Sequence, residues 1–320
     1  MLKSTHVPCL PRRTVLRGAA GIGAGIMAGS GFAARAHANP PKFKTVDDGF
    51  LTIAMSASMP ETGIDNGKLI GTDALMIQQI AKRLGLVAKP SVMAWASTIE
   101  SIQAGRADIM CGDMGWTQAR AQVMLLTDAI YYGGNYVTMP KSAPYTDSIR
   151  VSQLSGHSLG TGLGYSYVPE MKKIPGVGAV KLYGTSDACV RDMLAGRVDY
   201  VIIDAPIVSY MLMKRPDLDF KMVPLVYDAA YPSLTGKGRI VMGMGLHNPD
   251  LFDAVNDGVA WLWKEKLNAK YLAQYGLSNP GYLAPPPYNV RIGVDRDAKG
   301  NIIGPGAHTP KDYSALFGGA

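Results

Sequence analysis

A short segment occurs twice in this 320-residue chain, and it constrains the fold more than any other feature. Ala-Gly-Arg-Ala-Asp at residues 104–108 corresponds to Ala-Gly-Arg-Val-Asp at residues 195–199. Before each copy, apolar residues three and four positions apart indicate a helix with one buried face, and after each copy an apolar run indicates a strand. The glycine suits the end of such a helix because it lacks a Cβ and readily adopts the left-handed conformation. We therefore predict two α/β halves built on one plan.

An acidic residue follows each predicted strand: Asp113 in the first half and Asp204 in the second, each five residues beyond the aspartate of the repeat. Open α/β sheets bind ligands at the carboxyl ends of their strands, so two facing halves would bring both acids into one cleft. The alternative is that each acid only caps the next helix. Asp204 precedes Ala-Pro, which is typical of an N-cap, whereas Thr117 is the better N-cap candidate after Asp113.

Further segments follow one another in a fixed order, among them Leu-Thr-Ile-Ala at 51–54 and Lys-Leu-Ile-Gly-Thr-Asp at 68–73. The others are 81–85, Trp95, 103–108, 117–120, 127–132, 154–160 and 195–204. This order resembles the exported solute-binding proteins of polar-amino-acid uptake systems, family 3, over about residues 49 to 277. The resemblance implies an α/β fold of two lobes, the periplasmic binding protein type II or Venus flytrap fold, with a mixed sheet flanked by helices in each lobe. The implied boundaries are 49–138 plus 241–277 for lobe 1 and 139–240 for lobe 2.

The resemblance also implies roles for particular residues. Arg120 would grip the ligand carboxylate, for which the planar guanidinium fork is well suited. Asp204 would pair with the ligand ammonium, as burial of a charge requires. The glycine-rich loop at 160–166 would offer backbone N–H groups, with Tyr165 and Ser166 at its end. The alternative for Arg120 is an arginine on the surface of a helix.

Four positions depart from the family pattern, which carries an acid, an aromatic or small hydroxyl residues there: Ser56, Met59, Asp113 and Gly115. Trp95 and Trp116 are candidates to replace the missing aromatic surface, and the alternative is that both are core residues. Glu61 adds an acid two positions after Met59. With Glu61, Asp113 and Asp204 set against Arg120, the predicted cleft is net acidic and favours a cationic or amine-bearing solute.

The first 38 residues resemble a twin-arginine export signal. They contain Pro-Arg-Arg-Thr-Val-Leu-Arg at 11–17, a Gly- and Ala-rich stretch, and Ala-His-Ala at 36–38. A membrane anchor is the alternative, but the stretch at 18–34 is short and only weakly apolar. Removing this segment takes five basic residues and no acid, so the net charge falls from +7 to +2. We therefore expect a soluble periplasmic protein, and a nucleic-acid partner loses its support.

The remaining cysteines, Cys111 and Cys189, are expected to be buried free thiols, although a disulfide stays possible on sequence grounds. No histidine shows ligand spacing with them, so zinc is not expected. Copper at Met110, Cys111 and Met114 is the less favoured alternative, because methionine usually fills cores. We predict no metal and no cofactor.

About 43 residues, 278–320, follow the part that resembles the family. Pro-Pro-Pro at 285–287 indicates a stiff spacer. Apolar segments at 291–294 and 301–303, separated by a turn containing Gly300, predict a β-hairpin. Two roles stay open for this extension: it latches onto the body, or it binds a further partner.

Taken together, the sequence predicts a monomeric periplasmic protein that captures a polar or basic amino acid and presents it to the permease of an ABC importer. It is not expected to be an enzyme. One alternative is an accessory protein of a periplasmic dehydrogenase, with the extension as docking element. The other is an enzyme similar to cyclohexadienyl dehydratases, in which Asp113 or Glu61 would act as the acid.

Overall fold

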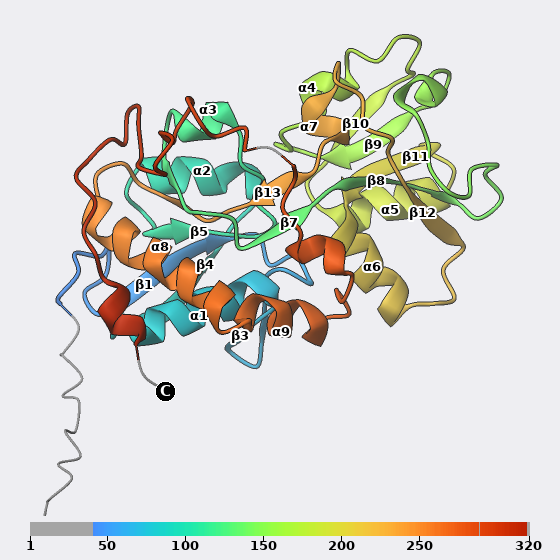
Figure 1. Cartoon of the computed structure of the whole chain (residues 1–320). Helices are drawn as coiled ribbons and strands as arrows, with labels where there is room; N and C mark the ends of the chain where they lie inside the picture. Colours follow the sequence, from blue (N-terminus) through green and yellow to red (C-terminus); the bar gives the residue numbers. More distant parts are fainter. Residues whose placement is uncertain (1–40, 288, 319–320) are drawn as a thin grey trace, which may run out of the picture. The chain divides into compact units, whose positions relative to one another are not determined.

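Two mixed sheets of five strands form the framework of the computed structural model, which describes residues 41–287 and 289–318 (Figure 1). The predicted export signal lies outside the described residues. The strand order in the first sheet is β4 (Val87–Val92), β1 (Phe50–Met55), β5 (Ile109–Met110), β14 (Gly243–Met244) and β6 (Leu125–Leu126). In the second sheet it is β10 (Val180–Tyr183), β9 (Leu159–Gly162), β11 (Tyr200–Asp204), β8 (Asn135–Pro140) and β12 (Phe220–Pro224).

The two sheets share one plan. In each, the first three strands in the order are parallel, and the fourth runs antiparallel to both of its neighbours. The third place belongs to β5 and β11, the strands that follow the repeated segment. The prediction of two α/β halves, each with a mixed sheet, is therefore confirmed. We call the first sheet with its helices lobe 1 and the second sheet with its helices lobe 2.

The repeated segment makes the same turn in both lobes. Gly105 and Gly196 follow the helices α2 (Trp95–Gln103) and α5 (Ser186–Leu194) with φ angles of 64° and 68°, a region that glycine enters without strain. The aspartate that ends each copy then binds the neighbouring parallel strand. Asp108 accepts a backbone N–H of β1 at 2.7 Å, and Asp199 accepts the N–H of the residue before β9 at 2.6 Å.

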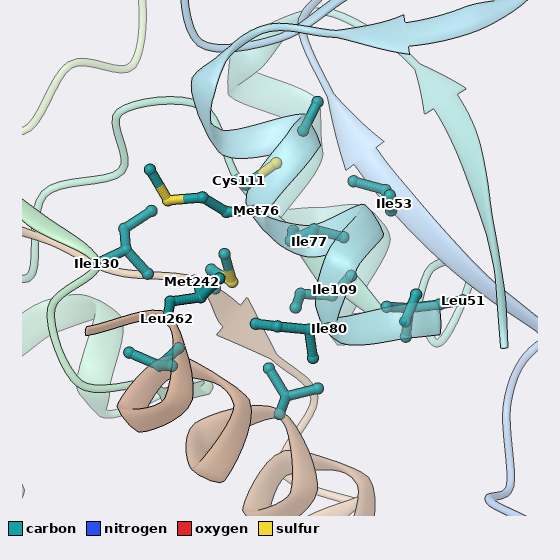
Figure 2. Packing of buried hydrophobic residues seen from close by; sticks show 14 of the residues in the cluster. Leu51, Ile53, Met76, Ile77, Ile80, Ile109, Cys111, Ile130, Met242 and Leu262 are labelled. Atoms are coloured by element: carbon teal, nitrogen blue, oxygen red, sulfur yellow. The ribbon is translucent and has the colours of Figure 1, made fainter. Parts of the chain in front are cut away.

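Helices cover both faces of the first sheet. Figure 1 shows α1, α8 and α9 on one face, and α2 and α3 lie over the other. Leu51 and Ile53 of β1 pack with Ile77 and Ile80 of α1 and with Leu262 of α8 in the largest core (Figure 2).

The helices have the following bounds: α1 (Thr72–Arg83), α2 (Trp95–Gln103), α3 (Gln118–Ala121), α4 (Val168–Met171), α5 (Ser186–Leu194), α6 (Ala205–Lys214), α7 (Pro232–Thr235), α8 (Pro249–Lys264) and α9 (Leu267–Gln274). Short elements are β2 (Gly63–Asp65), β3 (Lys68–Ile70) and the 3₁₀ helices η1 (Val151–Leu154), η2 (Pro280–Leu283) and η3 (Ser314–Phe317).

The chain passes from lobe 1 to lobe 2 earlier than predicted. A separate antiparallel pair, β7 (Tyr131–Gly133) with β13 (Gly238–Ile240), accompanies the two crossings between the sheets. By Asn135 the chain already belongs to the second sheet, where β8 pairs with β11 and β12. The boundary expected after residue 138 therefore falls inside β8. Gly133 ends β7, and only Gly134 separates it from β8.

The C-terminal extension packs against lobe 1. Near its end, Phe317 is buried with its ring 5.5 Å from that of Trp261 in α8. His308 binds Asp253 of the same helix at 2.8 Å. Of the two roles left open by the sequence, the contact with the body is present, while a further partner stays a prediction.

The β-hairpin predicted in the extension does not form as expected. Residues 291–294 and 301–303 contain no regular strand; Arg296 makes one antiparallel bridge with Ile302 and one parallel bridge with Ile292. The turn at 297–301 is present, and the Asp297 side chain accepts the N–H of Asn301 at 2.9 Å. The chain does not extend before this turn because the side chains of Arg291, Asp295 and Arg296 are buried against lobe 1.

Cys111 and Cys189 are both buried and free, and burial raises the pKa of both thiols, so neither is poised to react. In the described part of the chain, no helix has the length and apolarity that a membrane crossing requires.

Candidate ligand-binding site

One cavity of about 1240 Å³ is lined by residues from both lobes. It is larger than the roughly 300–1000 Å³ typical of small-molecule pockets. The structure brings every sequence-predicted site residue to its wall: Ser56, Glu61, Trp95, Asp113, Gly115, Arg120, Tyr165, Ser166 and Asp204. Met59 and Trp116 line it as well. Their part in ligand binding stays a prediction.

Arg120 is held inside the cavity wall by a short helix, α3. Thr117 begins this helix as predicted, with its hydroxyl accepting the N–H of Arg120 at 3.1 Å. The guanidinium donates to the Gly115 carbonyl at 2.6 Å and lies 5.8 Å from the ring centre of Trp95. Only 7% of the residue is exposed, which excludes a surface arginine. Burial lowers the Arg120 pKa to about 10, against the effect of the Asp204 charge, so the group stays cationic at neutral pH.

Asp204 ends β11 and precedes α6, the position expected of a helix cap. Its side chain nevertheless makes no capping hydrogen bond, so the capping alternative does not account for it. The carboxyl group lines the cavity instead. Burial raises its pKa to about 7, while the Tyr165 hydroxyl and the charge of Arg120 act in the opposite direction. Asp204 is therefore poised between its neutral and ionised forms near neutral pH.

Asp113 is fixed by two residues that the sequence analysis did not assign to the site. Its backbone N–H donates to the Asp73 carboxylate at 2.9 Å, and its side chain accepts a hydrogen bond from the Tyr131 hydroxyl at 3.0 Å. Burial, followed by the charges of Asp204 and Asp73, raises the Asp113 pKa. Asp73 lies in the Gly-Thr-Asp segment that carried the family resemblance, so its position was visible in the sequence but its role was not.

Glu61 is 1% exposed, and its Oε1 atom has no hydrogen-bond partner in the structure. The backbone around it caps α1, because the Glu61 carbonyl accepts the N–H groups of Asp73 at 3.0 Å and Ala74 at 3.2 Å. Burial is the main reason that the Glu61 pKa is raised, and the charges of Asp113, Asp73 and Asp204 raise it further. A buried carboxyl group without a partner favours a ligand that brings a donor or a positive charge.

Gly71 permits this close approach of α1 to the Glu61 loop. Its φ is 106°, and a Cβ there would collide with the Glu61 carbonyl oxygen. We expect Gly71→Ala to lower the free energy of unfolding by about 2 kcal/mol or more, measured by urea denaturation. Gly67→Ala is the matched control, since Gly67 also has a positive φ, of 75°, but has open space around it. Equal losses in the two variants would show that the contact with Glu61 is not the cause.

Lobe 2 contributes the loop after β9. The Tyr165 hydroxyl lies 3.3 Å from the Ser186 hydroxyl, and its ring stacks edge-on against Tyr167 at 5.6 Å. A Cβ on Gly162 would come within 2.5 Å of the Tyr165 ring, which explains the glycine at that point. Gly164 reaches the start of α2, where Trp95 lies, so this loop meets lobe 1 at the cavity.

The cavity wall also contains residues that the sequence analysis missed. Lys237 and Arg239 add positive charge, and Asp187, which pairs with Arg191, adds negative charge. The C-terminal extension contributes four apolar residues: Pro286, Pro287, Val290 and Val294. No sequence signal could have placed these four, because the extension lies beyond the part that resembles the family. Among the described residues, no group of three or more His, Cys, Asp or Glu side chains is arranged to hold a metal ion.

A pair of mixed α/β lobes with a shared cavity, lined by an arginine from one lobe and an aspartate from the other, defines a class of two-lobed solute-binding proteins. The chain belongs to the bacterial extracellular solute-binding proteins, family 3, whose pattern matches residues 51–278. The resemblance found in the sequence, the type II periplasmic binding protein fold and the solute-binding function are thereby confirmed.

Individual relatives are distant. The chain is 26% identical to the probable amino-acid-binding protein YxeM of Bacillus subtilis over 58% of its own length and 72% of that protein. It is 24% identical to the L-cystine-binding protein TcyJ of Escherichia coli (strain K12) over 69% of its own length and 80% of that protein. A structure of an ancestral arginine-binding protein bound to arginine has a TM-score of 0.62 and 22% identity, and covers 71% of this chain and 98% of that one. These relatives are named for binding rather than for catalysis, and the likeness to the solved structure shows the fold.

Proposed function

We propose that the protein captures an amino acid with a basic side chain in the periplasm and delivers it, as a monomer and without chemical change, to the permease of an ABC importer. The observation that carries this proposal is the placement of Arg120 and Asp204 on opposite lobes around one cavity. Arg120 would bind the α-carboxylate in two hydrogen bonds, and Asp204 would pair with the α-ammonium. The ligand would thereby bridge the lobes and favour the closed form.

The charges around this pair favour a basic side chain. After burial, the charge of Asp204 contributes to the raised pKa of both Glu61 and Asp113, and Glu61 has an unpartnered oxygen. A second positive charge on the ligand would offset this repulsion and supply the missing donor. Among the relatives, the arginine-binding periplasmic protein of Mannheimia haemolytica is named for a ligand of this class, whereas TcyJ is named for L-cystine, which has no basic side chain.

A thermal-shift screen of the purified protein tests the proposal. The compounds are L-arginine, L-lysine, L-ornithine, L-cystine, L-glutamate and prephenate. At a concentration a hundredfold above Kd, a ligand adds about 2.7 kcal/mol of stability and raises Tm by several degrees. We expect the largest shifts with the basic amino acids and none with L-glutamate. A shift with L-glutamate alone would contradict the proposed ligand class, and turnover of prephenate would favour an enzyme.

Affinity for L-arginine is expected to fall as the pH drops from 8 to 6. In the protein without solute, burial raises the Asp204 pKa to about 7, whereas an ammonium partner favours the ionised carboxylate. Binding below pH 7 must therefore release a proton from Asp204, so Kd rises by up to about tenfold for each pH unit. Calorimetry in two buffers with different ionisation enthalpies measures this release. An identical Kd at pH 8 and pH 6 would exclude Asp204 as the ammonium ligand.

A further inference from the structure

We propose that residues 286–287 and 289–296 of the C-terminal extension form an additional wall of the ligand site, and that Asp295 positions Trp116 within it. The wall would contact an apolar part of the solute, so the ligand would be a basic amino acid carrying an apolar substituent on its side chain. This inference rests on the proposed function, because Arg120 and Asp204 would bind the charged end of the same solute.

The wall is anchored by a buried charge cluster. Arg291, Asp295 and Arg296 are 3%, 4% and 4% exposed. The Arg291 guanidinium donates to the Asp295 carboxylate at 2.7 Å and to the Thr127 carbonyl at 2.6 Å, and Arg296 donates to the Leu126 carbonyl at 2.6 Å. These backbone carbonyls belong to lobe 1, directly at the end of β6. Charged groups buried in this way keep their positions, because separating an ion pair would leave a buried charge without its counter-charge.

Trp116 connects this cluster to the cavity. Its indole N–H donates to the Asp295 carboxylate at 3.0 Å, and the Arg291 guanidinium lies 5.9 Å from its ring centre. Its backbone N–H donates to the Arg239 carbonyl at 2.8 Å. The main chain of Trp116 is thus bound to β13, and its indole N–H is bound to the extension. A tryptophan fixed at both ends offers a flat apolar surface of defined orientation.

The cavity-lining residues of the extension are apolar. Pro286, Pro287, Val290 and Val294 line the cavity that Trp116 also lines. At the start of this segment the Lys237 ammonium donates to the Ala284 carbonyl at 2.5 Å, which holds the chain next to β13. A wall that offers only apolar groups favours the solute that buries the larger apolar area against it. The large volume of the cavity leaves space for such a substituent beyond the charged end.

Two probes that share the charged end test the ligand class by calorimetry: L-lysine and Nε-benzyl-L-lysine, which keeps both ammonium groups and adds a phenyl ring. We expect the benzyl compound to bind roughly tenfold more tightly, because its ring buries apolar area against the wall. Val290→Ser should remove most of this gain. Ile292→Ser is the matched control, since Ile292 is 46% exposed, like Val290 at 40%, but does not line the cavity.

The positioning role of Asp295 has a separate readout in the indole N–H resonance of Trp116, identified by its absence in Trp116→Phe. In the wild-type protein we expect slow exchange of this proton with water. Asp295→Asn should shift the resonance and raise the exchange rate about tenfold, since the charged acceptor is lost. If that variant fails to fold, Trp116→Phe serves instead, and it should weaken binding of benzyl-lysine more than binding of lysine.

The outcomes separate the two proposals. Tight binding of lysine with no gain for the benzyl compound, or equal effects of Val290→Ser and Ile292→Ser, would overturn the apolar wall while leaving the proposed function intact. Binding of neither compound would overturn the proposed function and the ligand class together. An indole resonance that is the same in the wild-type and Asp295→Asn proteins would overturn the positioning role of Asp295 in either case.

Discussion

Replacing Arg120 with methionine is expected to weaken binding of L-arginine about a hundredfold or more. The guanidinium is buried, and it would donate two charge-assisted hydrogen bonds to the ligand carboxylate that methionine cannot supply. Methionine keeps much of the volume against Trp95, so the fold should tolerate the change. Calorimetric titration of both proteins gives the ratio of the two Kd values.

Lys237→Met is the matched control for this prediction. Lys237 lines the same cavity and carries the same charge, but its ammonium is bound to the Ala284 carbonyl. We expect the Kd of this variant to stay within about threefold of the wild-type value, because Lys237 is exposed and its charge is screened by solvent. If Lys237→Met weakened binding as much as Arg120→Met, the carboxylate would not be bound by Arg120 alone.

The second large effect is expected from Asp204→Asn. Loss of the carboxylate should weaken binding of L-arginine about thirtyfold or more at pH 8, because the ligand ammonium would then be buried without its counter-charge. The variant should also bind with a weaker dependence on pH between 6 and 8. Asp187→Asn is the control, since Asp187 lines the cavity but is exposed and pairs with Arg191.

The thermal stability of the Asp204→Asn variant without ligand should not fall as its affinity does. The Asp204 pKa is raised to about 7 in the folded protein, so the ionised form that prevails at pH 8 is disfavoured by folding. Asparagine removes this charge, and the variant without ligand is expected to melt at the same temperature as the wild-type protein or higher at pH 8. A lower Tm would mean that Asp204 supports the fold, and the loss of affinity would then need a structural explanation.

The sequence predicted the lobes and the site through one physical relation. Because Gly105 and Gly196 end equivalent helices, β5 and β11 take the same place in their sheets. Asp204 is the last residue of β11, and Asp113 lies three residues beyond the end of β5. The crossing at Gly133 was harder to locate, since a break in a strand depends on which sheet accepts its hydrogen bonds. Tyr131 could not be assigned to the site either, because its hydroxyl reaches Asp113 through folding and not through spacing in the sequence.

The extension escaped prediction for a different reason. The sequence places Arg291 in a strand of the predicted hairpin and Asp295 and Arg296 in its turn, when only their neighbours in the chain are considered. Arg291 and Arg296 are buried because the carbonyls of Leu126 and Thr127 accept their hydrogen bonds, and those carbonyls are more than 160 residues away in the sequence. Asp295 is buried with them because its carboxylate accepts hydrogen bonds from both arginines. Contacts of this range leave no periodic pattern that a reading of the sequence could detect.

The attachment of the Arg291, Asp295 and Arg296 cluster to Leu126, Thr127 and Trp116 has a kinetic consequence. These partners all belong to lobe 1, which also carries Arg120. A solute arriving at the open protein would therefore meet the carboxylate site and the apolar wall already assembled, before lobe 2 closes. Solutes would then be distinguished largely by their association rates. Asp204 would chiefly lower the dissociation rate of the captured molecule. Stopped-flow fluorescence would show this as an association rate that responds to Val290→Ser and a dissociation rate that responds to Asp204→Asn.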